Sequence, residues 1–318
     1  ASARDQEAAC VHRRCAEALG MIAAIPLSLI LLIGVYLARR LPPNDNERDY
    51  LGIDAQETQH RYAQEFGHAR PPGRFPWRLP LEYWCYAWAG EHLLRARIAA
   101  LCVSLGAISI AMVYAQTLAG YRAALLVGAI VLSSPYLVGI FASASYVAPI
   151  SALWVGGLYA LHTGHPFVAM ACGVALTFLR ATAWWMALWL LWTSGGIVLA
   201  SGLAAYLWFA HREVVLSQGW VRFLRGQQPP MLNWAHGGWG LFFETIARRY
   251  ESWIAWGLML SILGHWQDHA AWLISISGAL FVLSHAPRTL FRPKWAAGYL
   301  AEWALPVAVG VATMLVRA

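Results

Sequence analysis

Long apolar runs separated by short polar turns make up most of the chain. These runs cover residues 19–37, 97–115, 123–141, 145–161, 165–192, 194–210, 252–266, 269–286 and 297–316. About 20 apolar residues in a helix cross a hydrocarbon core about 30 Å thick, because each residue adds about 1.5 Å. The pattern therefore predicts an all-α polytopic integral membrane protein with about nine transmembrane or membrane-entering helices.

The polar stretches predict how the chain is divided. Residues 1–18 are expected to form a cytoplasmic tail, 19–37 the first transmembrane helix, 38–96 a long extracytoplasmic loop with interfacial helices, and 97–318 a transmembrane helical bundle. Short turns at 118–121 and 162–166 imply antiparallel neighbours. The run 165–192 is too long for one ordinary span and carries Arg180 near its middle, so one crossing and two short helices meeting at a break both stay open.

Composition and charge agree with a membrane protein and exclude a nucleic-acid partner. The chain is 59% hydrophobic and 12% charged, and its net charge is +7. The basic residues are scattered among short loops, whereas a nucleic-acid surface gathers them into a stripe. With a single crossing at 165–192, most basic residues outside the long loop fall on the side of the N-terminus, which indicates a cytoplasmic N-terminus. The 18 tryptophans fit anchoring at the membrane interface.

The loop after the first run contains an acidic cluster, Asp45, Glu47 and Asp49, within Asn44–Leu51. Carboxylates this close together can bind a divalent cation, or one of them can act as a general base on a hydroxyl acceptor. The same pattern fits a solvated helix start, in which Asn44 or Asp45 caps the helix and Glu47 favours the positive end of its dipole. Both interpretations stay open at this point.

Further motifs follow the acidic cluster in a recognisable order. Arg70-Pro71-Pro72-Gly73-Arg74 comes next, and then an amphipathic aromatic segment at 81–88. This order resembles the GT-C superfamily of membrane glycosyltransferases, in particular the lipid A aminoarabinose transferase and protein O-mannosyltransferase type. Asp45–Leu51 is similar to the acidic motif of that family, and Arg70-Pro71-Pro72 to its His-Pro-Pro-like motif with Arg in place of His.

The resemblance continues through shorter stretches of the bundle. Residues 97–101 are similar to the family's "R-l-p-S-a-l" stretch, 132–136 to its "a-t-s-P" element, and 173–180 to its "G-l-a-l-l-t-K/R" run. One departure concerns residues 142–149, which hold no acid where the family often has Arg-x-Asp or Arg-x-Glu. The resemblance therefore allows two expectations, a compact enzyme or a relative that no longer catalyses.

The resemblance implies a reaction and a set of site residues. It implies transfer of a sugar from a polyprenyl-phosphate carrier to an acceptor at the outer face of a bacterial cytoplasmic membrane. The catalytic residues would be Asp45, Glu47 and Asp49, and the substrate-binding residues Arg70, Arg74, Arg180 and Tyr50. A divalent cation is the cofactor that the acidic cluster suggests, and membrane lipid and the lipid-borne donor are the expected partners. The rival hypothesis is a non-catalytic structural subunit of a larger membrane complex, to which the missing acid and the many tryptophans are suited.

Overall fold

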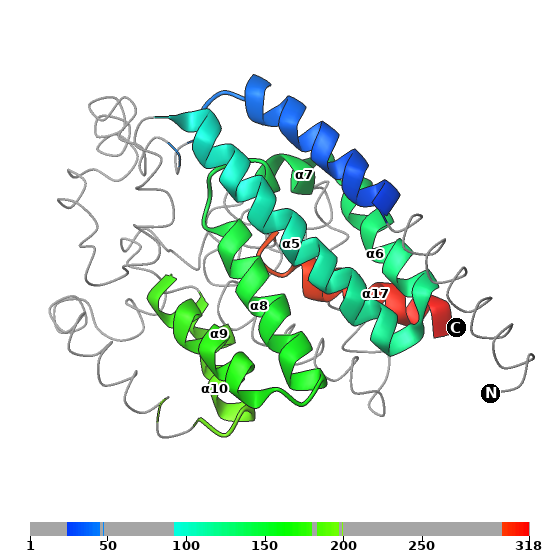
Figure 1. Ribbon diagram of the computed structural model, residues 1–318, viewed down its shortest axis with the longest axis vertical. Coiled ribbons are helices and arrows are strands. Elements are labelled where there is room, and N and C mark those ends of the chain that lie inside the picture. The colour runs from blue at the N-terminus through cyan, green and yellow to red at the C-terminus, as the bar shows by residue number, and fades with distance from the viewer. Residues whose placement is uncertain are drawn as a thin grey trace, which may run out of the picture.

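The structure is a computed structural model, and it describes residues 24–44, 47, 92–179, 183–196, 199 and 301–317. All regular secondary structure in these residues is helical, as the all-α prediction requires (Figure 1). Predicted runs 252–266 and 269–286, and most of 194–210, lie outside the described residues. The helices are the N-terminal helix (residues 24–40), α5 (Leu93–Ala119), α6 (Tyr121–Leu132), α7 (Pro135–Phe141), α8 (Val147–His162), α9 (Pro166–Leu179), α10 (Trp184–Thr193) and α17 (Ala304–Arg317).

Helix α5 is the clearest candidate for a membrane span. Its 27 residues extend over about 40 Å, more than a hydrocarbon core needs. Among the described helices it alone is long and apolar enough to cross a membrane, and a second span is counted if α6 and α7 are taken together. The predicted run began at residue 97, whereas the helix begins at Leu93, so Arg95 and Arg97 lie within it. It ends at Gly120, whose φ of 79° favours glycine.

The predicted span 123–141 is divided between two helices. Helices α6 and α7 meet at an angle of 84° across Ser133 and Ser134. The Ser134 hydroxyl accepts a hydrogen bond from the backbone N–H of Leu137, and Pro135 occupies the first turn of α7. A serine cap followed by proline is the ordinary start of a new helix, because proline lacks the N–H that would continue the previous one. Irregular backbone of this kind is tolerated at membrane depth only where protein covers it.

The run 165–192 forms two short antiparallel helices, α9 and α10, which agrees with the second of the two expectations for this run. Met170 of α9 lies against Gly196, whereas Gly173, one turn further along α9, lies against Ala187 and Leu191 of α10. The order along one helix is thus reversed along the other. The two helices are about 21 Å and 15 Å long, and each is shorter than a hydrocarbon core.

The last helix has a consequence for the sidedness of the chain. Nη2 of Arg317, at the end of α17, donates to the carbonyl oxygen of Leu118 at the end of α5, at 2.7 Å. Arg122 follows Leu118 across the turn at Gly120 between α5 and α6. Arg122 and Arg317 therefore belong to the same end of the bundle. The α9–α10 hairpin returns the chain to the end of the bundle at which α9 begins.

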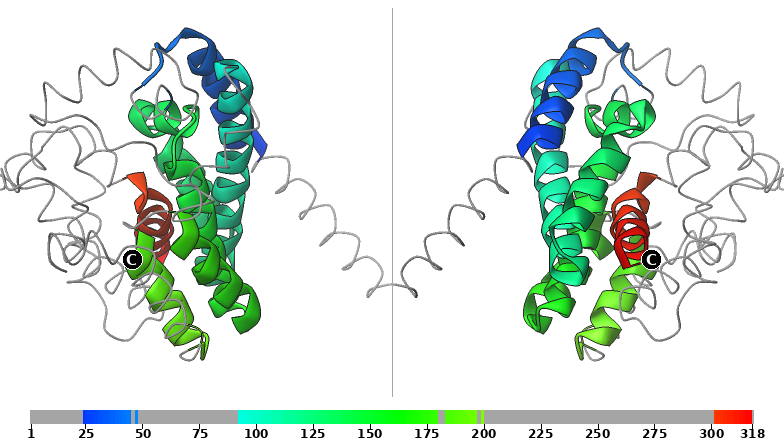
Figure 2. Two further views of the ribbon diagram at one scale, coloured as in Figure 1. Left: turned by 90° about the vertical axis from the view of Figure 1, so that its left-hand side faces the viewer. Right: turned by 90° about the vertical axis from the view of Figure 1, so that its right-hand side faces the viewer.

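The N-terminal helix packs antiparallel to α5. A Cβ added at Gly34 would lie 2.6 Å from Leu101 Cδ1, and one at Gly128 of α6 would lie 2.9 Å from the Pro26 ring. Glycine thus allows close approach at both places. The side views in Figure 2 show this helix lying along α5 and α6. The C-terminal end of the N-terminal helix, where the predicted long loop begins, therefore lies beside the first turns of α5.

Candidate functional site

The N-terminal helix ends in a sequence that cannot continue it. The backbone N–H of Leu41 donates to Leu37 at 2.9 Å, and Pro42 and Pro43 follow. Proline has no N–H to donate. The last carbonyl groups of any helix lack partners within the helix and need donors from elsewhere. Here a single side chain of α5 donates to one of these carbonyl groups, that of Ala38, and to those of Leu41 and Pro42 just beyond the helix.

That side chain is Arg97, on the second turn of α5, which is 1% exposed. Its Nη1 donates to the carbonyl oxygens of Ala38 at 2.8 Å and Leu41 at 2.7 Å. Its Nη2 donates to the carbonyl oxygen of Pro42 at 2.9 Å. A positive charge at the C-terminal end of a helix is also favoured by the helix dipole. Arg97 therefore caps the N-terminal helix from outside.

The remaining donors of Arg97 meet Glu47. Nε of Arg97 lies 2.8 Å from Oε1 of Glu47, and Nη2 lies 2.8 Å from Oε2. This is the bidentate geometry in which the planar guanidinium matches a carboxylate. Together the five hydrogen bonds use all five N–H groups that an arginine side chain has.

Glu47 is as fully used as Arg97. Its Oε1 also accepts from the backbone N–H of Ala144 at 2.8 Å, and its Oε2 from the backbone N–H of Asn44 at 2.9 Å. Asn44 in turn accepts from the backbone N–H of Glu47 at 2.9 Å. This exchange between residues three apart is the capping box that begins many helices. We call the whole assembly the Arg97–Glu47 cluster: the two side chains, the carbonyl groups of 38, 41 and 42, Asn44, and the N–H of Ala144.

The cost of burying two charges explains why the polar atoms of Arg97 and Glu47 are all paired. Glu47 is 0% exposed, and burying two charges costs more than their attraction returns unless the geometry is close and every polar atom is paired. A carboxylate offers about four acceptor positions, and all four are occupied here. Glu47 therefore has no position left for a substrate proton or for a metal ion in this arrangement. What it can do chemically is hold three segments of the chain together.

The interpretation of Asn44–Leu51 as a solvated helix start is correct for the cap and wrong for the solvation of Glu47. Asn44 does accept a hydrogen bond from the backbone N–H of Glu47, as expected of a capping residue, and the return bond to Glu47 makes it a capping box. The expected solvation is wrong, because Glu47 is fully buried against α5 and the turn before α8. The helix dipole alone would have left the carboxylate at the surface, and the charge of Arg97 brings it inside.

Six of the seven predicted site residues lie outside the described residues: Asp45, Asp49, Tyr50, Arg70, Arg74 and Arg180. Their roles stay predictions, and so does the catalytic role predicted for Glu47. Within the described part of the chain, no group of three or more His, Cys, Asp or Glu residues could hold a metal ion.

Arg97 is the residue that sequence reasoning missed. The sequence predicts that the apolar run begins at residue 97, whereas the structure puts both Arg95 and Arg97 in α5 and, of the two, buries only Arg97. A signal was present, because Arg97 stands directly before the longest apolar part of α5 and a charge there needs a partner. Naming Glu47 as that partner required a contact between residues 50 positions apart.

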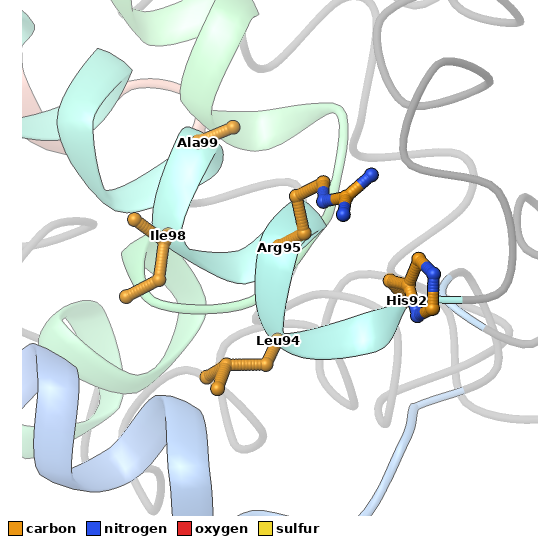
Figure 3. A pocket seen from close by; sticks show the side chains of 5 residues that line it. All are labelled: His92, Leu94, Arg95, Ile98 and Ala99. Atoms are coloured by element: carbon orange, nitrogen blue, oxygen red, sulfur yellow. The ribbon is translucent and has the colours of Figure 1, made fainter.

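An open hollow of about 500 Å³ lies beside the cluster on the outer face of α5. It is lined by His92, Leu94, Arg95, Ile98 and Ala99, all from the first turns of that helix (Figure 3). The lining is mostly apolar and includes neither Glu47 nor Arg97. The buried ion pair is therefore not part of this hollow.

The chain was also compared with known proteins. No protein family model, no curated protein and no solved structure matches it. The geometry at the start of the long loop is therefore the main basis for a functional proposal.

Proposed function

We propose that the chain is a GT-C-like glycosyltransferase that moves a sugar from a polyprenyl-phosphate carrier to an acceptor at the outer face of a bacterial cytoplasmic membrane. The observation that carries this proposal is the Arg97–Glu47 cluster. It joins a residue of the acidic loop to the arginine of a second stretch through which the chain resembles that family. Two short resemblances distant in sequence thus belong to one contact.

A third stretch supports the same proposal. Ala144 donates its N–H to Glu47 from within residues 142–149, where the family often has an additional acid and this chain has none. The break at Ser133–Ser134–Pro135, which is similar to another family element, leads into this segment through α7. Segments in which the family's functional groups would be expected therefore gather at one end of the bundle.

The proposed membrane arrangement places this end outside. About nine segments would cross or enter the membrane, of which α5 is the clearest among the described helices. Arg122 and Arg317 share the opposite end, and we propose that this end is cytoplasmic because both residues carry a positive charge there. The acidic loop would then face the compartment that a lipid-linked sugar occupies after it has crossed the membrane.

The chemistry needs a base and a cationic holder. A hydroxyl of the acceptor attacks the anomeric carbon of the sugar, the bond from that carbon to the carrier phosphate breaks, and polyprenyl phosphate leaves with the bonding electrons. A carboxylate takes the hydroxyl proton. Since the oxygens of Glu47 are occupied, we assign the base to Asp45 or Asp49, with or without a divalent cation. Arg180, Arg70 and Arg74 would hold the anionic leaving group, and Tyr50 would contact the substrate.

The test is transfer of labelled sugar from polyprenyl phosphate by the purified chain. We expect Asp45→Asn or Asp49→Asn to lower the rate by about 100-fold or more, the usual contribution of a general base. If both variants transfer sugar at the wild-type rate, the assignment of the base to Asp45 or Asp49 fails.

The rival function, a structural subunit of a larger membrane complex, is favoured by one observation. The one described carboxylate of the acidic cluster is saturated by structural contacts. The described helices also expose large apolar side chains, with Phe167 82% and Trp192 67% exposed, which either lipid or other subunits would cover. Purification in a mild detergent separates the two functions, because a fixed stoichiometric set of co-eluting membrane proteins would favour the subunit.

A further inference from the structure

We propose that Arg97 is a positioning residue, which fixes the start of the acidic loop in one orientation at the end of the bundle. Its consequence for catalysis rests on the proposed function, whereas its effect on the loop does not. Arg97 contacts no reacting group in this proposal and acts through Glu47.

The five N–H groups of Arg97 connect two parts of the chain. Three of the five hydrogen bonds of Arg97 go to the carbonyl groups of Ala38, Leu41 and Pro42, and two go to Glu47. A guanidinium is planar and rigid, so five bonds in one plane determine both its position and its rotation. The end of the N-terminal helix and the carboxylate of Glu47 are therefore held at a fixed distance from each other.

The carboxylate of Glu47 links these two parts to a third. Oε1 of Glu47 also accepts from Ala144, in the fully buried turn between α7 and α8. Glu47 thus connects three segments: the exit of the N-terminal helix, α5, and this turn. A change that moves the guanidinium moves the carboxylate, and the backbone of Asn44 and Glu47 moves with it through the capping box.

The positioning role of Arg97 differs from that of a partner in a simple ion pair. An ion pair requires opposite charges, and it is restored when the two charges are exchanged. Here an exchanged pair would place a carboxylate against three carbonyl oxygens, and an arginine against the N–H groups of Asn44 and Ala144. Like partial charges would then face each other in a buried site, so the exchange is expected to fail.

The experiment uses hydrogen exchange of the full chain in detergent. We expect Arg97→Lys, which keeps the charge and loses the fork, to speed exchange at least tenfold in peptides covering both 38–44 and 142–146. Arg97→Gln should do the same. The exchanged pair, Arg97→Glu with Glu47→Arg, should not restore protection. Arg95→Gln is the matched control, because Arg95 is exposed two residues earlier on the same helix, and it should leave both peptides unchanged.

A kinetic measurement accompanies the exchange. If the chain transfers sugar, Arg97→Lys should lower kcat at least tenfold while KM for the donor stays within about twofold, and Arg95→Gln should change neither. A lower kcat with a nearly unchanged KM indicates that the acidic loop is misoriented and that donor binding is retained.

The outcomes separate the two proposals. Unchanged exchange in Arg97→Lys, or full protection in the charge-exchanged variant, overturns the positioning role whatever the activity. Wild-type kcat in Arg97→Lys overturns its catalytic consequence. An absence of transfer by the wild-type chain overturns the proposed function, and the exchange result still decides the role of Arg97. Should Arg97→Gln fail to accumulate, Arg97→Lys provides the decision.

Discussion

The middle of the bundle and the Arg97–Glu47 cluster are held together in different ways. In the middle, the rings of Trp154 of α8 and Trp303, which precedes α17, meet edge to face with their centroids 5.7 Å apart. Both side chains are fully buried, and Nε1 of Trp154 has no hydrogen-bond partner among the residues that the structure describes. At the cluster, every N–H of Arg97 and every acceptor position of Glu47 is used.

The difference teaches which contacts determine geometry. Apolar packing has no direction, so it fixes how closely helices approach and leaves some freedom to slide. Hydrogen bonds between charged groups are directional, and a buried charge that loses its partner is costly. We therefore expect the middle to respond to changes of volume and the cluster to respond to any change of chemistry. Substitutions at the Arg97–Glu47 cluster, at a close helix contact and at a surface contact should therefore lower stability by decreasing amounts.

The largest effect is expected for Glu47→Ala. It leaves the Arg97 guanidinium buried without its anionic partner and the N–H groups of Ala144 and Asn44 without an acceptor. Loss of one partner of a buried pair costs about 3–5 kcal/mol. Thermal unfolding in detergent should show a correspondingly lower midpoint. A midpoint within two degrees of the wild type would mean that the cluster is not a main support of this end.

An intermediate effect is expected for Gly128→Ala in α6. The new Cβ would lie 2.9 Å from two atoms of the Pro26 ring, which cannot rotate away, so the N-terminal helix must shift. Overpacking of this kind costs about 1–3 kcal/mol. Gly106→Ala is the control, since no atom lies within 4 Å of its new Cβ and alanine favours a helix by about 0.5–1 kcal/mol. Equal unfolding midpoints for the two variants would contradict the close packing at Pro26.

The smallest effect on stability is expected for Arg317→Gln. Arg317 is exposed and donates to Leu118, and surface contacts usually contribute less than about 1 kcal/mol. The same position gives a sharper test of sidedness. In a background without native cysteines, Arg317→Cys and Arg122→Cys should react with an impermeant thiol reagent from one side of the membrane, and Asn44→Cys from the other. Labelling of the first two from opposite sides would refute the shared end.

Parts of the helical structure could be predicted from local signals. The turns at Gly120 and Gly164 were expected, and both glycines have positive φ. The break before α7 also had a local signal, because Ser134–Pro135 is a cap followed by a first-turn proline, but the surrounding apolar run concealed it. The early start of α5 was missed since residues 93–96 were assigned to the long loop, whereas a partner buried within the protein lets Arg97 lie inside the helix.

The candidate site was predictable only in part for a related reason. The carboxylates of the acidic cluster were visible in the sequence, and so was the expectation that Asn44 or Asp45 caps a helix. The burial of Glu47 was not visible, because burial depends on which cation the fold brings near. Arg97 stands 50 positions away, and Arg95, Arg70 or Arg74 would have served a sequence argument equally well.

The sequence by itself determined that the described chain is helical, where its apolar runs lie, and that carboxylates begin the long loop, because these features depend on neighbours along the chain. Only the tertiary structure decided that α9 and α10 fold back on each other, that Arg317 returns to the end of α5, and that Arg97 is the partner of Glu47. These features depend on contacts between distant residues. An apolar run carries no information about its direction, and a charge carries none about which opposite charge it will meet.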